Sequence, residues 1–230
     1  MRDKIFLMLF MLFTGMSLIA QTEEEAPDYD KIARQINNRE SELYYPRLMR
    51  RFAANDTTLS LEDYRTLYYG FTMQEDYDPY RVSPYTVKMK EFSVADTISL
   101  TACDSIIKYG LKAVDDFPFD IRSMNLLIYG YKCKKDEKQR WIWTEKLKNI
   151  IDAIISSGDG ESEESAFHVI YPAHEYDIIN RFGLTAKNSV LIPPALDYIE
   201  VSDNKFNIKG YFFNISRILD VYHQKFEEKQ

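Results

Sequence analysis

Apolar residues recur at intervals of three and four along the first two thirds of the chain, which is the spacing of one helix face. The strongest helix start is at Ser60, a residue type that caps helices, with Asp63 three positions later. Leu61, Leu67 and Phe71 follow on one face. The same spacing predicts helices in segments 29–38, 44–55, 57–74, 93–117, 121–135 and 140–157.

Two segments interrupt this pattern. Residues 75–91 contain Pro79 and Pro84 and predict an irregular connection. Residues 158–165 contain glycine, serine and acidic residues without an apolar side chain, which predicts a linker.

The pattern changes after the linker, because short runs become rich in β-branched and aromatic residues. The runs AFHVIY, SVLIPP, LDYIEV and NIKGYFFNI predict strands, and the last two flank SDN as in a hairpin. The sequence therefore predicts an α+β fold, with antiparallel helical hairpins followed by a small β-rich part. The expected regions are a leader at 1–20, a helical region at 21–157, a linker at 158–165 and a β-rich region at 166–230.

The first twenty residues have the layout of a secretory signal peptide. Arg2 and Lys4 precede an uninterrupted apolar run over residues 5–13, and a softer segment ends at Ala20. Acidic residues 23–25 follow, where a membrane-anchoring segment usually carries basic ones. We expect cleavage near Ala20, export to the periplasm or beyond, and no membrane span in the remaining chain.

The chain is acidic, and this narrows its partners. It carries 29 basic and 36 acidic side chains among 230 residues, a net charge of −7. Such a surface repels phosphate backbones, and no basic stripe interrupts it, so nucleic acid is excluded as a partner. The expected partner is an unknown envelope protein or a small ligand.

A tyrosine-glycine pair occurs three times inside apolar runs, in LYYGF (67–71), IKYGL (107–111) and LIYGY (127–131). Glycine inside a helix costs about 0.5–1 kcal/mol relative to alanine, so close packing of a second helix is the expected reason for it. Ala113 and Pro118 are five apart, and Leu127 and Tyr131 four apart. In these spacings the helical region resembles a tetratricopeptide repeat, although the early tryptophan of that motif is absent.

The chain also resembles the domain of unknown function 4919 family of exported bacterial proteins. The resemblance is carried by LYYGFTMQEDYDPY, AFHVIYPAHEYDIINRFGL and YFFNISRI. That family has no assigned activity. The resemblance therefore implies export and the domain layout, and it transfers no catalytic residue.

Cys103 and Cys133 lie fifteen residues before and after Pro118. In an antiparallel helical hairpin that turns at Pro118 they stand level with each other, on helices about 8–10 Å apart. A disulfide between them is therefore possible in an oxidising compartment. Two buried free thiols packed near each other are the alternative.

The proline-bearing connection is the first candidate for a ligand site, because exposed tyrosines on a stiff loop offer rigid contact area. The alternative is that these tyrosines fold back as a plug on the helices. Calcium coordination is disfavoured, since the segment lacks the glycine and glutamate of a calcium loop in register. A catalytic carboxylate pair is also disfavoured, since two carboxylates on one loop are commonly solvated charges. The candidate ligand residues are Tyr77, Tyr80, Tyr85, Asp76 and Asp78.

No coherent catalytic or metal-binding set is found. His168, His174 and Glu175 match no zinc spacing, and no nucleophile motif of the G-x-S-x-G type is present. We expect no cofactor. The favoured hypothesis is an exported binding or interaction module, and the alternative is a hydrolase of envelope peptides or glycans with its site between the two halves, near Asp76, Asp78, His168 or His174.

Overall fold

The computed structural model describes residues 25–93 and 99–226, and in this part of the chain the predicted α+β class is confirmed. The predicted leader, residues 1–20, lies outside the described residues. Within these residues, no helix has the length and apolar character needed to cross a membrane. The elements are α1 (Tyr29–Asn37), α2 (Tyr45–Ala53), α3 (Leu61–Phe71), α4 (Pro84–Ser93), α5 (Leu100–Asp116), α6 (Ile121–Cys133), α7 (Glu137–Ile155), β1 (Phe167–His168), α8 (Pro172–Arg181), β2 (Ala186–Ile192), β3 (Leu196–Val201), β4 (Gly210–Asn214) and α9 (Ser216–Phe226).

The predicted start of α3 is confirmed in detail. The Ser60 hydroxyl accepts a hydrogen bond from the Asp63 backbone N–H at 3.2 Å, and the Asp63 carboxylate accepts one from the Ser60 N–H at 2.8 Å. This reciprocal pair satisfies two backbone donors that a helix start leaves free. Asp120 and Asp136 cap α6 and α7 with their side chains in the same position.

The prediction of an irregular connection over residues 75–91 is wrong in its second half, where α4 begins at Pro84. A proline in the first helical position loses nothing, because the N–H of that residue has no partner within the helix. The Ser83 hydroxyl accepts a hydrogen bond from the Tyr85 N–H at 3.3 Å. Pro84 therefore starts a helix, whereas the sequence pattern predicts that it interrupts one.

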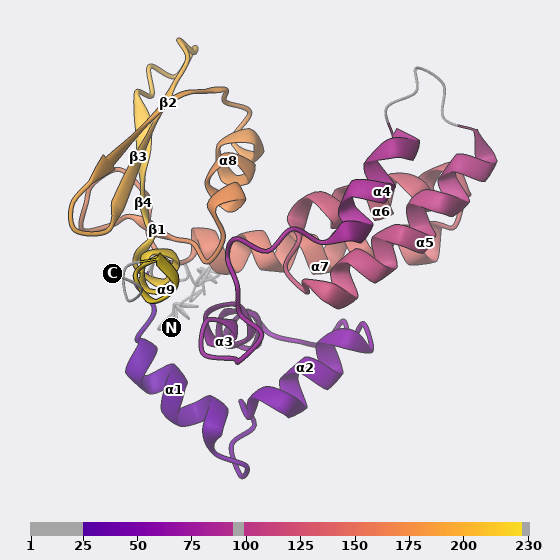
Figure 1. Ribbon diagram of the computed structural model, residues 1–230, viewed down its shortest axis with the longest axis horizontal. Helices are drawn as coiled ribbons and strands as arrows, with labels where there is room; N and C mark the ends of the chain where they lie inside the picture. The colour runs from indigo at the N-terminus through magenta and orange to yellow at the C-terminus, as the bar shows by residue number, and fades with distance from the viewer. Residues whose placement is uncertain (1–24, 94–98, 227–230) are drawn as a thin grey trace, which may run out of the picture.

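Helices α4 to α7 stack one after another and extend away from the sheet, while α3 packs against α7 and contacts α1 and α2 (Figure 1). Glycines mark the closest approaches. A Cβ on Gly110 would lie 2.8 Å from the Leu127 side chain, and one on Gly130 would lie 2.9 Å from Ile107. The interpretation of the tyrosine-glycine pairs as close helix packing is confirmed for these glycines.

Cys103 of α5 and Cys133 of α6 are joined by a disulfide, with their Cα atoms 6.3 Å apart. Further along the same two helices, Gly130 meets Ile107 and Gly110 meets Leu127. Residue numbers rise along α5 and fall along α6 from one contact to the next, so the two helices are antiparallel. The bond lies far from the turn at Pro118 and fixes the open end of this hairpin.

The four strands form one sheet in the order β1-β4-β3-β2. The predicted pairing of the hairpin is confirmed, because β3 and β4 are antiparallel neighbours, with Ile199 opposite Tyr211. The connection is longer than the predicted SDN and spans residues 202–209. β1 contains only Phe167 and His168 of the predicted run AFHVIY, and it pairs parallel with β4. The sheet thus pairs β1, which follows α7 in the sequence, with β4, which precedes α9.

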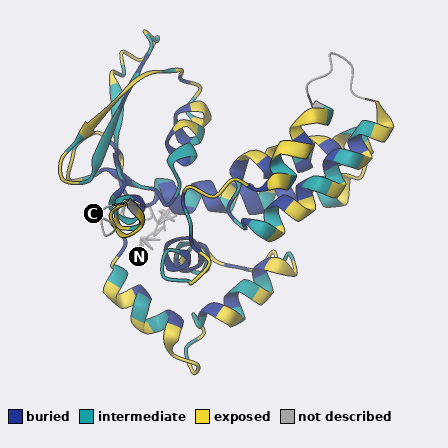
Figure 2. Cartoon of the chain, viewed as in Figure 1, coloured by how far each residue is buried: buried dark blue, intermediate teal, exposed yellow. Residues whose placement is uncertain are grey.

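The helical and β-rich regions share one hydrophobic core. Leu67, Ile150 and Phe119 from the helical region belong to the same buried cluster as Ile199 and Phe213 of the sheet. Buried residues are concentrated along α3 and the inner part of α7, next to the sheet (Figure 2). The sheet and helices therefore bury each other's apolar faces.

Segment 158–165, which the composition suggests is a linker, is folded into a compact turn. The Gly160 N–H donates to the Ser165 carbonyl at 2.8 Å, and the Gly160 carbonyl accepts from the Phe212 N–H of β4 at 2.9 Å. Gly158 is buried, and its Cα faces the Ser165 carbonyl. This turn attaches the end of α7 directly to the sheet.

Candidate functional site

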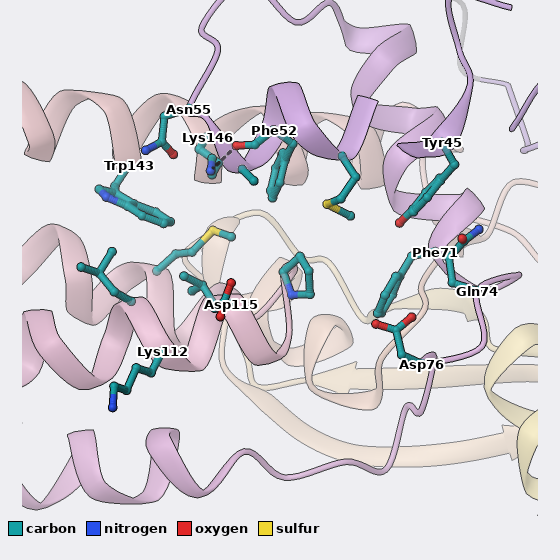
Figure 3. A pocket seen from close by; sticks show the side chains of 16 residues that line it. Tyr45, Phe52, Asn55, Phe71, Gln74, Asp76, Lys112, Asp115, Trp143 and Lys146 are labelled. Atoms are coloured by element: carbon teal, nitrogen blue, oxygen red, sulfur yellow. Dashed lines mark hydrogen bonds between the residues drawn. The ribbon is translucent and has the colours of Figure 1, made fainter. Parts of the chain in front are cut away.

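A pocket of about 620 Å³ lies between α2 and α3 on one side and α5, α6 and α7 on the other (Figure 3). Its volume is within the range of about 300–1,000 Å³ that is typical of small-molecule sites. Exposed Leu111, Lys112, Asp115 and Asp76 form its rim. Its floor is buried and largely aromatic, and consists of Tyr45, Phe52, Phe71, Met124, Trp143 and Lys146.

The floor contains a buried cation, Lys146 of α7, which is only 5% exposed. Its Nζ donates to the Phe52 carbonyl at 2.8 Å and lies 4.1 Å from the Phe52 ring centroid and 4.7 Å from that of Trp143. No carboxylate of the described residues forms an ion pair with it. Burial lowers the pKa of Lys146 to about 8, so at pH 7 the side chain is still mainly an ammonium.

The position of this cation follows from the helices around it. Phe52 stands in the last turn of α2, where carbonyl groups carry partial negative charge. Its carbonyl accepts from the Asn55 N–H at 3.0 Å as well as from Lys146. Trp143 and Lys146 are three residues apart on α7 and therefore share a face. The ammonium thus interacts with a helix C-terminus and two aromatic rings, and neither of these neutralises its charge.

Two polar atoms near Lys146 are buried without a hydrogen-bond partner, Asn55 Oδ1 and Trp143 Nε1. Asn55 follows α2 in a left-handed conformation, with φ of 57°. Burial raises the pKa of the Tyr131 hydroxyl, which lies near Trp143 Nε1, but the indole N–H makes no hydrogen bond of normal geometry. Asp116 Oδ2 and Asp177 Oδ2 also lack a partner, but these two residues do not line the pocket. Two unpaired polar atoms next to one cavity are available to a ligand.

The opposite end of the pocket is acidic and polar. Gln74 and Asp76 follow the end of α3 and lie beside Phe71, away from Lys146 and Trp143 (Figure 3). Lys112, at the rim, points away from the pocket, and its Nζ lies 5.3 Å from the Tyr85 ring centroid. The pocket therefore has a cationic end at Lys146 and an anionic end at Asp76, with Asp115 at the rim between them (Figure 3).

A sequence family described as Domain of unknown function (DUF4919) matches residues 30–224. The chain belongs to the DUF4919 family. The matched range contains the whole pocket, and it confirms the resemblance seen in the sequence. Neither a curated protein nor a solved structure matches the chain.

The DUF4919 structure separates the five candidate ligand residues of the connection. Tyr77 is buried, its hydroxyl donates to the Ile170 carbonyl at 2.7 Å, and its ring packs on Phe71. For Tyr77 the plug alternative is therefore correct, and this residue is no part of an exposed ligand surface. Asp76 is the one member of the five that lines the pocket.

The remaining three candidates lie in other contacts. Asp78 forms an ion pair with Lys225 of α9 at 2.5 Å and accepts a hydrogen bond from the Tyr80 N–H. The Tyr80 ring, 39% exposed, lies 6.4 Å from the Tyr222 ring. Tyr85 lies under the Lys112 ammonium. These contacts attach the connection to α9 and α5, and they do not direct the three side chains to a common point.

His174 is an internal hydrogen-bonding residue of the DUF4919 fold. Its Nε2 lies 3.0 Å from the Phe119 carbonyl, which only accepts, so this nitrogen carries the proton. Nδ1 then accepts from the Tyr68 hydroxyl at 2.7 Å, and that oxygen accepts from the Ile170 N–H at 3.3 Å. Burial lowers the pKa of His174 to about 4, which keeps the ring neutral.

His168 has different neighbours from His174. Its Nδ1 lies 3.4 Å from the Tyr29 hydroxyl, and burial lowers its pKa to about 4. Neither histidine lines the pocket that contains Asp76. No group of three metal-binding side chains is found within the described residues.

A second polar cluster lies between α8 and the sheet. Glu175 is buried, and burial together with the nearby Asp197 of β3 raises the pKa of its carboxyl group to about 9. The Ser189 hydroxyl lies 2.7 and 2.8 Å from the two carboxylate oxygens of Asp197, which share its single proton. Glu175 is therefore a protonated, hydrogen-bonded residue at pH 7.

We expect the stability of the protein to fall with decreasing pH through His174. The unfolded chain binds the proton near pH 6.5 and the folded one only near pH 4, so protonation favours unfolding between these values. The loss is about 1.4 kcal/mol per pH unit, or about 2 kcal/mol at pH 5. Urea unfolding at pH 5 and 7 of the wild type and of His174→Gln measures it, since the neutral glutamine keeps both hydrogen bonds without titrating. Parallel pH profiles of the two proteins would contradict this prediction.

Sequence reasoning missed the pocket residues Lys146, Trp143 and Asn55. A signal for Lys146 was present, because it lies within the apolar stripe of α7 formed by Trp143, Leu147 and Ile150. A lysine within an apolar helix face either buries its ammonium or extends its side chain towards solvent. For Asn55 the sequence offers no comparable signal.

Proposed function

We propose that this DUF4919 protein is an exported binding module of the periplasm or cell envelope, and that the pocket holds a small molecule with an anionic group. The observation that carries the proposal is Lys146, an ammonium that is buried in an aromatic pocket and has no carboxylate partner among residues 25–93 and 99–226. Export rests on the apolar leader at residues 5–13 with its preceding basic residues.

The energetic argument concerns the cost of a buried charge. Moving an ammonium out of water costs several kcal/mol, which one carbonyl and two ring faces offset only in part. A ligand carboxylate or sulfonate beside Lys146 would add a charge-assisted hydrogen bond in a site already shielded from water. The apolar walls of Phe52, Phe71 and Met124 would bury the remainder of the ligand.

The hydrolase alternative receives no support from a specific observation. Asp78 pairs with Lys225, and His174 is bonded to Tyr68 and Phe119. Asp76 alone of the four residues considered for that activity faces the pocket. The arrangement favours retention of a ligand over its chemical conversion.

The test uses Trp143 as a reporter. Trp141 is 51% exposed and lies outside the pocket, so Trp141→Phe leaves the pocket indole as the tryptophan signal. We expect decanoate and 1-anilinonaphthalene-8-sulfonate to change its emission in a saturable manner, and decanol to bind more weakly. Lys146→Met should weaken binding of the anions at least about tenfold. The same substitution should leave stability unchanged or raised, because it removes a desolvated charge.

Lys148→Met is the matched control, because Lys148 lies on the same helix, is exposed and pairs with Asp152. It should leave anion binding unchanged. Equal binding by wild type and Lys146→Met, or equal losses in both variants, would overturn the proposed site.

A further inference from the structure

The distribution of charge in the pocket narrows the class of ligand. The lining contains two lysines, Lys112 and Lys146, and two aspartates, Asp76 and Asp115, so its formal charges balance. Of the lysines only Lys146 is buried in the floor, at one end, and Asp76 lies at the other end next to Gln74 (Figure 3). A simple fatty anion would satisfy one end and place an apolar tail against the carboxylate at the other.

We infer that the pocket binds a short apolar peptide with free ends, whose terminal carboxylate meets Lys146 and whose terminal ammonium meets Asp76. This inference rests on the proposed function and names its ligand class. Each end of such a zwitterion is complemented by an opposite charge, and its side chains lie against Phe52, Phe71 and Met124.

The unpaired amide oxygen of Asn55 favours a peptide over a zwitterion without amide groups. Asn55 Oδ1 is buried at the Lys146 end and lacks a donor. The peptide N–H that precedes a terminal carboxylate supplies a donor next to that carboxylate. A buried acceptor that gains a hydrogen bond removes an unfavourable contribution from the free protein.

The rim also suits a peptide. Asp115 and Leu111 are exposed at the opening, and Gln74, half-buried, donates its side-chain N–H to the Gly70 carbonyl at 3.0 Å. That bond fixes the Gln74 amide and leaves its side-chain oxygen as an acceptor near Asp76. Two acceptors at one end match an ammonium, which has three donors.

The experiment compares the peptides Leu-Phe, Leu-Leu-Phe and Leu-Leu-Leu-Phe with their N-acetylated and C-amidated forms. Binding is followed by Trp143 emission in the purified Trp141→Phe protein, with calorimetry as a second readout. For the best length, we expect C-amidation to weaken binding at least about tenfold, because it removes the charge pair with the buried Lys146. N-acetylation should weaken binding by a smaller factor, about threefold, because Asp76 is exposed.

Two variants test which terminus of the peptide meets which charged residue of the pocket. Asp76→Asn should remove the penalty of N-acetylation and keep that of amidation, whereas Lys146→Met should do the reverse. Such crossed effects are what a mutant cycle gives for two independent pairs. Glu75→Gln, next to Asp76 and outside the pocket lining, is the control and should change neither penalty.

The outcomes separate the two proposals. If decanoate binds through Lys146 but the free peptides bind no better than their blocked forms, the peptide inference is wrong and the anion pocket stands. If neither decanoate nor any peptide binds, the proposed function itself is wrong. Crossed penalties in the two variants would support both.

Discussion

Replacing Gly158 with alanine is expected to lower the free energy of unfolding by about 3 kcal/mol or more, at the upper end of overpacking effects. A Cβ at this position would lie 2.1 Å from the Ser165 carbonyl oxygen and 2.8 Å from its carbon. Both are backbone atoms of the turn that joins α7 to the sheet, so no side chain can rotate out of the way. Urea unfolding monitored by circular dichroism measures the loss.

Gly183→Ala is the matched control for Gly158→Ala. Gly183 has a φ of +71°, but no atom lies within 4 Å of its Cβ position. Its substitution should therefore cost only the strain of a left-handed alanine, about 1–2 kcal/mol. If the two variants are equally stable, the turn at residues 158–165 can shift to accommodate the added Cβ. The interpretation of this segment as a rigid turn would then be wrong.

Removing the Cys103–Cys133 disulfide is expected to lower the free energy of unfolding by about 3–4 kcal/mol. The bond closes a loop with a sequence separation of 30, and without it the unfolded chain gains the corresponding freedom. The substitutions are Cys103→Ala and Cys133→Ala together, because Cys103 is fully buried and a serine there would place a hydroxyl group in the core.

Reduction of the unmodified protein is an independent measurement of the same effect. Dithiothreitol should lower the urea midpoint of the wild type towards that of the double variant, and it should leave the variant unchanged. A wild-type midpoint that is insensitive to the reductant would show that the bond does not contribute to stability. The antiparallel contact of Gly110 with Leu127 and of Gly130 with Ile107 is expected to remain in both proteins.

Local features of the fold could be predicted because their causes are local. The cap at Ser60 depends on a residue three positions away, and β3 and β4 are consecutive strands joined by residues 202–209. The proximity of Cys103 and Cys133 follows from one turn and from the constant rise per residue of the two helices that it joins. In each case the residues that determine the structure are close in sequence or linked by one regular element.

Only one residue of the pocket lining, Asp76, could be predicted from the sequence, because the walls come from five helices and the segments between them. α3 contacts both α2 and α7, so the orientation of these two helices depends on how α3 packs. That packing involves residues far apart in the sequence. Tyr77 illustrates the same limit, since its hydroxyl bonds to Ile170, ninety-three residues away. Side chains of one short segment, Asp76, Tyr77 and Asp78, were thereby directed to three different places.

The parallel pairing of β1 with β4 has a consequence for folding kinetics. Phe167 and His168 pair with Phe213 and Asn214, 46 residues further along the chain. A contact between residues so far apart in sequence carries a large loop-closure entropy and forms slowly. We therefore expect this strand pair to form late, after the hairpin of β3 and β4.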